Sequence, residues 1–342
     1  MIAATAFRIA LLGLGVSFLS GCYILRQGCG QLDVLLHRRN VDRVLAGSAK
    51  EEEKRKILLV LEAKAFGERS LALRPTNNYT TFFDTRGKPV SWAVTASRKD
   101  RFDPYTWWFP IVGTIPYKGF FDKEDAFEEA RELEAKGYDV SVGVVGGYST
   151  LGWFSDPIFS SMLEQSEEEL VELILHELTH STVYAKGHGD FNESLATFVG
   201  REGAIEFVRR RWGERAEIYR RTLDRFADED RIDGFMQELF RELDAFYRTR
   251  PADVVTGREA IWERARERFR EEVQRLLKVE KYDWILKVKI NNAMILSRRR
   301  YGRTDLFRNH FEAAGRDWRR FFERMRAIAD APDPMKALEP GR

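Results

Sequence analysis

The chain of 342 residues has little cysteine, histidine or proline, with two, five and ten of each. It also lacks an excess of either charge, because 56 basic and 54 acidic side chains leave a formal net charge of +2. A near-neutral chain carries no electrostatic signature of nucleic-acid binding, so we expect no nucleic-acid partner. Hydrophobic residues make up 44% of the chain and charged residues 32%, which excludes intrinsic disorder and a protein with several membrane spans.

The N-terminus has the pattern of a bacterial lipoprotein signal peptide. Its apolar stretch, residues 9–19, has about half of the roughly 20 residues that a membrane-spanning helix needs. The stretch runs into L-S-G-C, which resembles the lipobox, and this resemblance implies that residues 1–21 are removed and that Cys22 is lipidated. Acyl chains on Cys22 tie a protein stably to a membrane. Because Tyr23 stands where an inner-membrane retention signal has aspartate, we expect the periplasmic face of the outer membrane.

Apolar spacing along the rest of the chain predicts both helices and strands. Residues 31–73 favour two helices, and residues 122–136 favour an amphipathic helix that stops at Gly137. From residue 214 the chain is charged and helical in pattern, with Arg and Glu four residues apart. Short β-rich runs predict strands at Val90–Ala96, Trp107–Val112 and Asp139–Val145.

Ser166 opens a further helix with a capping box, and residues 170–184 are apolar on nearly every face of that helix. Within it stands the H-E-x-x-H arrangement, formed by His176, Glu177 and His180. Residues four apart share one face of a helix, so the two histidines can direct ring nitrogens at one zinc ion. Glu177 is rotated by about 100° and is placed to take a proton from a metal-bound water. Two histidines hydrogen-bonded within the core are the alternative, which leaves buried polar groups without a purpose.

A catalytic zinc takes three protein ligands and leaves one position for water, so a third ligand is expected nearby. Glu193, in the N-E-S-L-A stretch after a glycine-containing loop, is the candidate that we favour. Two alternatives stay open: Glu193 could close a capping box with Asp190, or His188 in the loop could be the ligand. The expected cofactor in either case is Zn²⁺.

This chemistry predicts hydrolysis of peptide bonds, with zinc activating water and Glu177 acting as the general base. The oxyanion needs one more donor, for which Tyr301 is a candidate, and ordinary packing of an amphipathic tyrosine is the alternative. A glycine-flanked segment before the histidine helix could bind a substrate peptide as an extra strand, or could be a tight aromatic turn. The candidate substrate-binding residues are Ser149, Thr150, Leu151 and Gly152.

These features together resemble the bacterial family of zinc-dependent aminopeptidase lipoproteins, which are gluzincin-like H-E-x-x-H metallopeptidases. The motifs that carry the resemblance are the lipobox, Gly30-Gln31-Leu32, the stretch 148–154, H-E-L-T-H, F-N-E-S-L-A-T and Asn291-Asn292-Ala293. The resemblance spans most of the mature chain. It implies zinc at His176, His180 and Glu193, Glu177 as the general base, and an aminopeptidase acting on peptides. A zinc-dependent endopeptidase, a cell-envelope amidase and a non-enzymatic zinc-binding lipoprotein are the alternatives.

The elements and motifs predict an α+β fold, with a small sheet and a buried H-E-x-x-H helix followed by a mainly helical C-terminal part. We expect four regions along the chain. They are the signal peptide at 1–21, the N-terminal and catalytic region at 22–213, the helical region at 214–330 and a disordered tail at 331–342. The tail is expected from its terminal position and its prolines. No oligomeric state is predicted.

Overall fold

The computed structural model describes residue 23 and residues 27–28, 30–109, 113–145, 155–279 and 281–339. The predicted signal peptide, Cys22 and the candidate substrate-binding residues 149–152 lie outside the described residues. Within the described ranges, no helix combines the length and the apolar character needed to cross a membrane.

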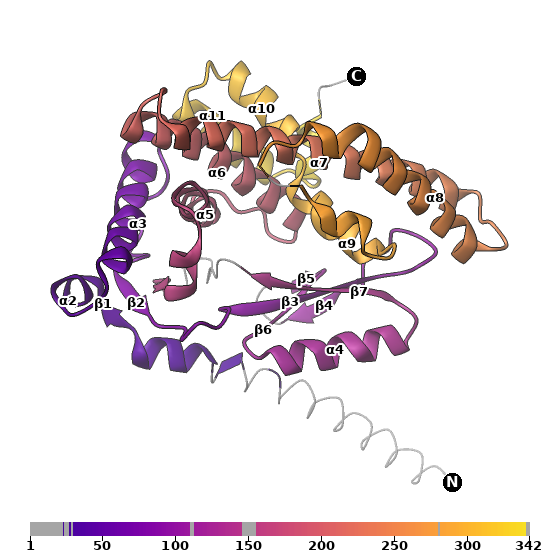
Figure 1. Cartoon of the computed structure of the whole chain (residues 1–342), viewed down its shortest axis with the longest axis horizontal. Coiled ribbons are helices and arrows are strands. Elements are labelled where there is room, and N and C mark those ends of the chain that lie inside the picture. Colours follow the sequence, from indigo (N-terminus) through magenta and orange to yellow (C-terminus); the bar gives the residue numbers. More distant parts are fainter. Residues whose placement is uncertain are drawn as a thin grey trace, which may run out of the picture.

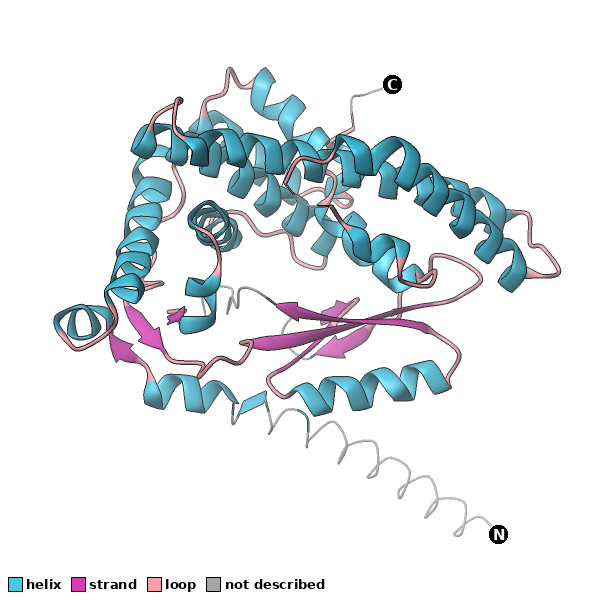
Figure 2. Ribbon diagram, viewed as in Figure 1, coloured by secondary structure: helices cyan, strands magenta, loops and turns pink. Residues whose placement is uncertain are grey.

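Helices dominate the described chain, and small sheets lie among them (Figures 1 and 2). This mixture, with a mainly helical C-terminal part, confirms the predicted α+β fold. The helices are α2 (Val41–Ala46), α3 (Glu51–Ser70), α4 (Lys123–Ala135), α5 (Glu167–His180), α6 (Gly189–Trp212), α7 (Glu217–Arg248), α8 (Val254–Arg268), α9 (Asn292–Tyr301), α10 (Thr304–Ala313), α11 (Trp318–Ala329) and α12 (Pro334–Ala337). Residues 30–37 are also helical. The stretch 31–73 therefore contains three helical segments rather than the two expected.

The strands form three small sheets in the described chain. They are β1 (Arg39–Asn40), β2 (Thr81–Phe83), β3 (Ser91–Ser97), β4 (Trp107–Phe109), β5 (Gly113–Ile115), β6 (Lys118–Phe120), β7 (Asp139–Val145) and β8 (Ile158–Phe159). The sheet orders are β1-β2-β8, β6-β3-β7 and the hairpin β4-β5. The predicted strands at 90–96 and 139–145 are confirmed as β3 and β7, which pair antiparallel with each other. The strand expected at 107–112 is present as β4, and residues 110–112 lie outside the described ranges.

Helices cover the sheet β6-β3-β7 from two sides. α4 packs against β3 and β7, and α9 packs against the same two strands. Figure 1 shows α4 on one side of this sheet and α5, α6 and α9 on the other, with the helix of residues 30–37 beyond the end of the sheet, below β2. The sheet therefore separates α4 from the helix that carries the H-E-x-x-H arrangement, whereas Val34 of helix 30–37 lies in the same buried core as α5.

α5 begins and is buried as the sequence predicts. The Ser166 hydroxyl accepts a hydrogen bond from the Glu169 backbone N–H, and the Glu169 carboxylate accepts one from the Ser166 backbone N–H. Its apolar side chains, including Leu170, Val171, Ile174, Leu175 and Leu178, are fully buried. The helix ends at His180 rather than near residue 184, and the Thr182 N–H bonds to the Thr179 carbonyl three residues back, a tighter turn than that of an α-helix.

Residues 331–339 of the C-terminal tail, the part that the structure describes, differ from the expectation of disorder at 331–342. Residues 334–337 form α12, which Asp333 caps through its side chain and which has proline in its first turn. Leu338 is 2% exposed within the main core, and its carbonyl accepts a hydrogen bond from the buried His310 ring. Burial of Leu338 in the core therefore orders a segment that its composition predicted to be disordered in solvent.

α9 is fastened to β7 at its first residues. Asn291 caps the helix and donates a hydrogen bond from its side-chain amide to the Val140 carbonyl at 2.7 Å. The Asp139 carboxylate accepts bonds from the Asn292 backbone N–H at 2.8 Å and from Arg258 at 2.6 Å. The Asn-Asn run of the sequence therefore anchors α9, and the helix extends from there to Tyr301.

Asp139→Ala tests this anchor. The variant leaves the guanidinium of Arg258, 5% exposed, without its carboxylate. Breaking a buried ion pair on one side costs about 3–5 kcal/mol, so we expect a loss of that size in the free energy of unfolding, measured by urea denaturation. Glu217→Ala, which removes an exposed pair with Arg220, is the control and should leave the midpoint unchanged. Equal midpoints for the two variants would contradict the assignment.

Candidate metal centre

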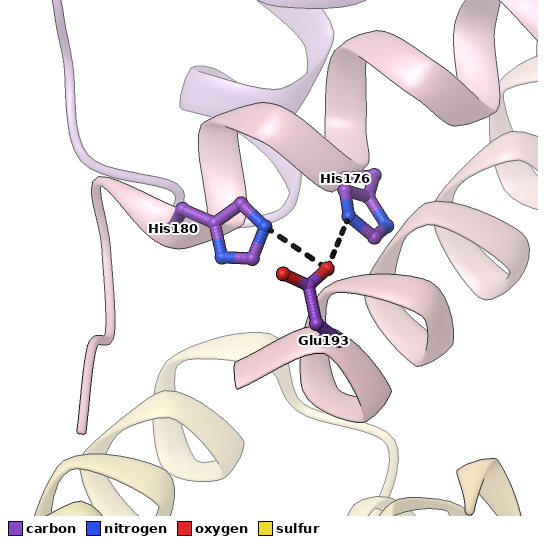
Figure 3. A group of neighbouring side chains, drawn as sticks. All are labelled: His176, His180 and Glu193. Carbon is purple, nitrogen blue, oxygen red and sulfur yellow. Dashed lines mark ion pairs between the residues drawn. The ribbon is translucent and has the colours of Figure 1, made fainter. Parts of the chain in front are cut away.

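Two histidines and one glutamate converge between α5 and α6. His176 and His180 lie on one face of α5, and Glu193 faces them from α6 (Figure 3). Glu193 Oε2 is 3.3 Å from His176 Nε2 and 3.6 Å from His180 Nε2. Ligands about 2.1 Å from a tetrahedral zinc are about 3.4 Å from one another, so these atoms have the spacing of zinc ligands. Among the described residues, this is the one group of three His, Cys, Asp or Glu with ligand atoms within 4.8 Å of one another.

The loop between α5 and α6 sets the position of Glu193. The Asn192 side chain accepts a hydrogen bond from the Ala185 N–H and donates one to the Ala185 carbonyl, both at 2.8 Å. These two hydrogen bonds close the loop, and α6 starts at Gly189. The N-cap of α6 is His188, so Asp190 lies inside the helix and cannot be its N-cap. The capping-box alternative for Glu193 with Asp190 is therefore wrong. His188 does not belong to the group of three ligand atoms.

Burial and charge oppose each other within the group. Burial raises the pKa of Glu193, but the charges and hydrogen bonds of His180 and His176 outweigh it and hold that pKa well below its usual range. Burial lowers the pKa of His180, and the Glu193 carboxylate reverses the shift, so this pKa is raised. Glu193 is therefore ionised at neutral pH, as an anionic ligand must be.

Glu177 and Tyr301 both lie at this centre. Glu177 is 9% exposed, and its charge contributes to the raised pKa of His180. The Tyr301 ring centre lies 6.4 Å from that of His176, with the ring planes at 28°. Although 37% of Tyr301 is exposed, protein atoms reduce the hydration of its hydroxyl, and together with the charge of Glu193 they raise its pKa well above the usual range. The hydroxyl therefore keeps its proton and remains a hydrogen-bond donor.

A second phenol near the centre, Tyr117, has no signal in the sequence. Reduced hydration and the charge of Glu193 raise the pKa of Tyr117 to about 12, against the opposing charge of Arg300. The Arg300 guanidinium lies 5.3 Å from the centre of the Tyr117 ring. Tyr117 precedes β6 and reaches the centre only through the tertiary fold, so no local spacing could have identified it.

A polar stripe along α5 continues the histidine face toward the start of the helix. Its members, spaced four residues apart, are Glu168, Glu172, His176 and His180. Two arginines of α7 pair with its acids: Arg225 with Glu172 at 2.5 Å and Arg221 with Glu168 at 3.2 Å. These pairs fix the rotation of α5 that points the histidines at α6. The four-residue spacing before His176 was a signal that the sequence analysis missed.

The chain matches the protein family described as "Putative aminopeptidase" over residues 22–338. The chain belongs to this family. The matched range contains the histidines and Glu193 as well as Tyr301, and the family supports a peptidase function. The assignment confirms the aminopeptidase part of the resemblance found in the sequence. Searches of curated proteins and of solved structures found no match.

Gly200→Ala tests the close approach of α5 and α6. A Cβ at Gly200 would lie 3.0 Å from the Glu172 carbonyl oxygen and 3.4 Å from His176 Cβ. The helices must move apart to admit it, so we expect zinc affinity to fall about 10-fold or more in a titration against a competing chelator.

Gly234→Ala on α7 is the matched control, because its Cβ meets nothing within 4 Å. An alanine there should raise the free energy of unfolding by about 1 kcal/mol through helix propensity alone and leave zinc affinity unchanged. Equal zinc affinities in the two variants would show that the Gly200 contact does not position the ligands.

Proposed function

We propose that this protein is a zinc-dependent peptidase, specifically an aminopeptidase, that is tethered to the bacterial cell envelope through lipidated Cys22. The observation that carries the proposal is the spacing of His176, His180 and Glu193, which matches the edges of a tetrahedral zinc site. Two imidazoles and one carboxylate are a ligand set of catalytic zinc in peptidases. The family assignment supports peptides as the substrate class.

The number of available ligands supports a catalytic rather than a structural role for a bound zinc. Structural sites use four protein ligands, whereas catalytic sites use three and keep a position for water. Across the described ranges, neither His188 nor any other His, Cys, Asp or Glu joins the three. This favours an enzyme over the alternative of a non-enzymatic zinc-binding lipoprotein.

Bound zinc would activate a water molecule and polarise the scissile carbonyl. Glu177 follows His176 directly on α5, so its carboxylate can accept the proton of the attacking water and pass it to the leaving amine. Tyr301 keeps its hydroxyl proton and donates a hydrogen bond to the carbonyl oxygen as negative charge develops there. His176, His180 and Glu193 hold the metal in this scheme.

The location follows from the N-terminus. The L-S-G-C sequence is the support for lipidation, and the family match begins at Cys22, where processing would leave the mature N-terminus. The residue after the cysteine, Tyr23, favours the outer membrane facing the periplasm. We propose that Ser149, Thr150, Leu151 and Gly152, which follow β7 along the chain, bind the substrate backbone.

Glu177→Gln tests the proposed reaction. In a soluble chain that lacks residues 1–21 and carries Cys22→Ser, we expect the variant to keep zinc and to lose about 10²–10⁴-fold in hydrolysis, because the general base is removed. Metal analysis and mass spectrometry of a digested peptide library measure both properties. His180→Ala is the control and should lose zinc. A Glu177→Gln variant that cleaves like the parent would overturn the mechanism. Cuts that start at free N-termini identify an aminopeptidase, and internal cuts identify an endopeptidase.

Tyr301→Phe tests the oxyanion donor. Removing one such donor costs about 10²–10³-fold in kcat, so we expect a loss of this size with little change in KM. Tyr117→Phe is the comparison, since its hydroxyl lies near the same centre but on a different element. A larger loss in kcat for Tyr117→Phe than for Tyr301→Phe would assign the donor to Tyr117 instead.

A further inference from the structure

Tyr23, which directly follows the proposed lipidation site, is fixed to a sheet. Its hydroxyl donates a hydrogen bond to the Gly119 carbonyl of β6 at 2.7 Å. Its ring centre lies 5.5 Å from that of Phe120, and Lys118 Nζ lies 4.5 Å from the Tyr23 ring centre. Adjacent Cα atoms are about 3.8 Å apart, so an acylated Cys22 stays within one residue of this attachment.

This attachment leaves no linker between the proposed lipid anchor and the folded chain. A flexible linker of n residues lets a domain move by about 5–6 Å multiplied by the square root of n. With a single peptide bond between the acylated residue and Tyr23, the surface around Tyr23 must itself lie at the bilayer. The orientation of the protein on the membrane is then set by its fold.

The helix of residues 30–37 presents an apolar face close to this point. Leu32 and Leu36 are four residues apart on one side of the helix and are 56% and 75% exposed. Leu36 is the most exposed large apolar side chain in the part of the chain that the structure describes. Gly30 lies against the ring of Phe121, where a Cβ would overlap the ring, so the start of the helix packs beside β6. Burying a leucine side chain lowers the free energy by about 1.5–3 kcal/mol, so a surface that covers Leu32 and Leu36 would be stabilised by their burial.

The charges around this helix suit a lipid surface. The one acidic residue of the helix, Asp33, pairs with His37 at 2.8 Å. Arg39 and Arg43 follow the helix and are exposed, where they can meet lipid phosphates. The exposed acids of α4, which lies along the same edge of the molecule as helix 30–37 in Figure 1, disfavour contact of α4 with anionic lipid and leave helix 30–37 as the contacting element.

We propose that helix 30–37 docks on the bilayer that holds the acyl chains of Cys22, with Leu32 and Leu36 entering the headgroup region. The inference rests on the lipidation in the proposed function. Short amphipathic helices bind membranes in this way, lying in the interface with the apolar face inward. Figure 1 shows helix 30–37 at the lower edge of the molecule and α5 and α6 above it, so this docking holds the metal centre between α5 and α6 away from the bilayer surface. Peptides therefore reach it from the aqueous phase, and segments embedded in the bilayer are excluded as substrates.

Spin labelling of the lipidated full chain tests the docking. A nitroxide is placed at Leu36→Cys in a Cys29→Ser background, and the protein is reconstituted into vesicles of phosphatidylethanolamine and phosphatidylglycerol. We expect the label to lose several-fold in accessibility to a water-soluble nickel chelate and to gain accessibility to oxygen on reconstitution. A label at Leu58→Cys on α3, where leucine is 54% exposed, is the control and should remain accessible to the chelate.

The outcomes separate docking from tethering. A vesicle-bound protein whose Leu36 label is as accessible to the chelate as the Leu58 label overturns the docking and leaves the tether intact. Protein that stays in the supernatant overturns both. Spin–spin broadening at Leu36 without vesicles overturns the docking in favour of a second copy on this face.

A double variant gives an independent measurement. The variant with both Leu32→Asp and Leu36→Asp should stay on vesicles through its acyl chains. It should lose the protection from amide hydrogen exchange that residues 30–37 gain on binding to vesicles. Leu58→Asp should keep that protection. Hydrolysis of soluble peptides should be the same in both variants, because none of the substituted leucines belongs to the metal centre. Unchanged protection in the double variant would contradict the docking.

Discussion

His176, His180 and Glu193 meet only if α5 and α6 pack closely and α5 is rotated so that its histidines face α6. Contacts within and around the two helices hold this arrangement. α6 turns glycines toward α5: a Cβ at Gly203 would lie 2.8 Å from a Leu175 methyl, and Gly200 lies against the His176 turn. Without side chains there, the helix backbones approach closely. α3 packs against α5 through a further glycine, and α7 fixes the rotation of α5 through its arginines.

The polar stripe on α5 buries groups that destabilise the fold unless they have partners. The acids of the stripe and its histidines differ in the partners that they have. Burial raises the pKa of Glu172, and the charges of Arg225 and Arg201 oppose the shift, so this acid has cationic partners within the protein. One turn later the stripe has no arginine. His176 and His180 share a single carboxylate, and His180 Nδ1 is buried without a hydrogen-bond partner in the described structure. The stripe is thus least compensated where zinc is proposed to bind.

Patterns of neighbouring residues in the sequence correctly predicted several helices and strands. The capping box began α5, the apolar runs gave β3 and β7, and four-residue spacing put the histidines on one face. The placement of Glu193 came from the coordination chemistry of zinc, since no periodicity joins α5 to α6. Contacts between distant segments left no such signal: Arg258 and Asp139 are 119 residues apart in sequence, and Tyr117 reaches the centre only through folding. The prediction of disorder at 331–342 was wrong over the described residues for the same reason. The composition of the tail does not reveal that Leu338 packs in the core.

α9 links the start of β7 to the helix that carries Glu193. The helix has ten residues, a length of about 15 Å, and its first turn is bonded to Asp139 at the start of β7. Its last turn is bonded to α6, because the Ser194 hydroxyl donates to the Arg300 carbonyl at 2.7 Å, next to Tyr301 and next to Glu193. Tyr301 is therefore on a helix that is held at both ends, by β7 and by the helix that carries Glu193. In the proposed reaction, a donor held in this way would need no rearrangement as charge develops on the substrate, which is the condition for electrostatic stabilisation of the transition state.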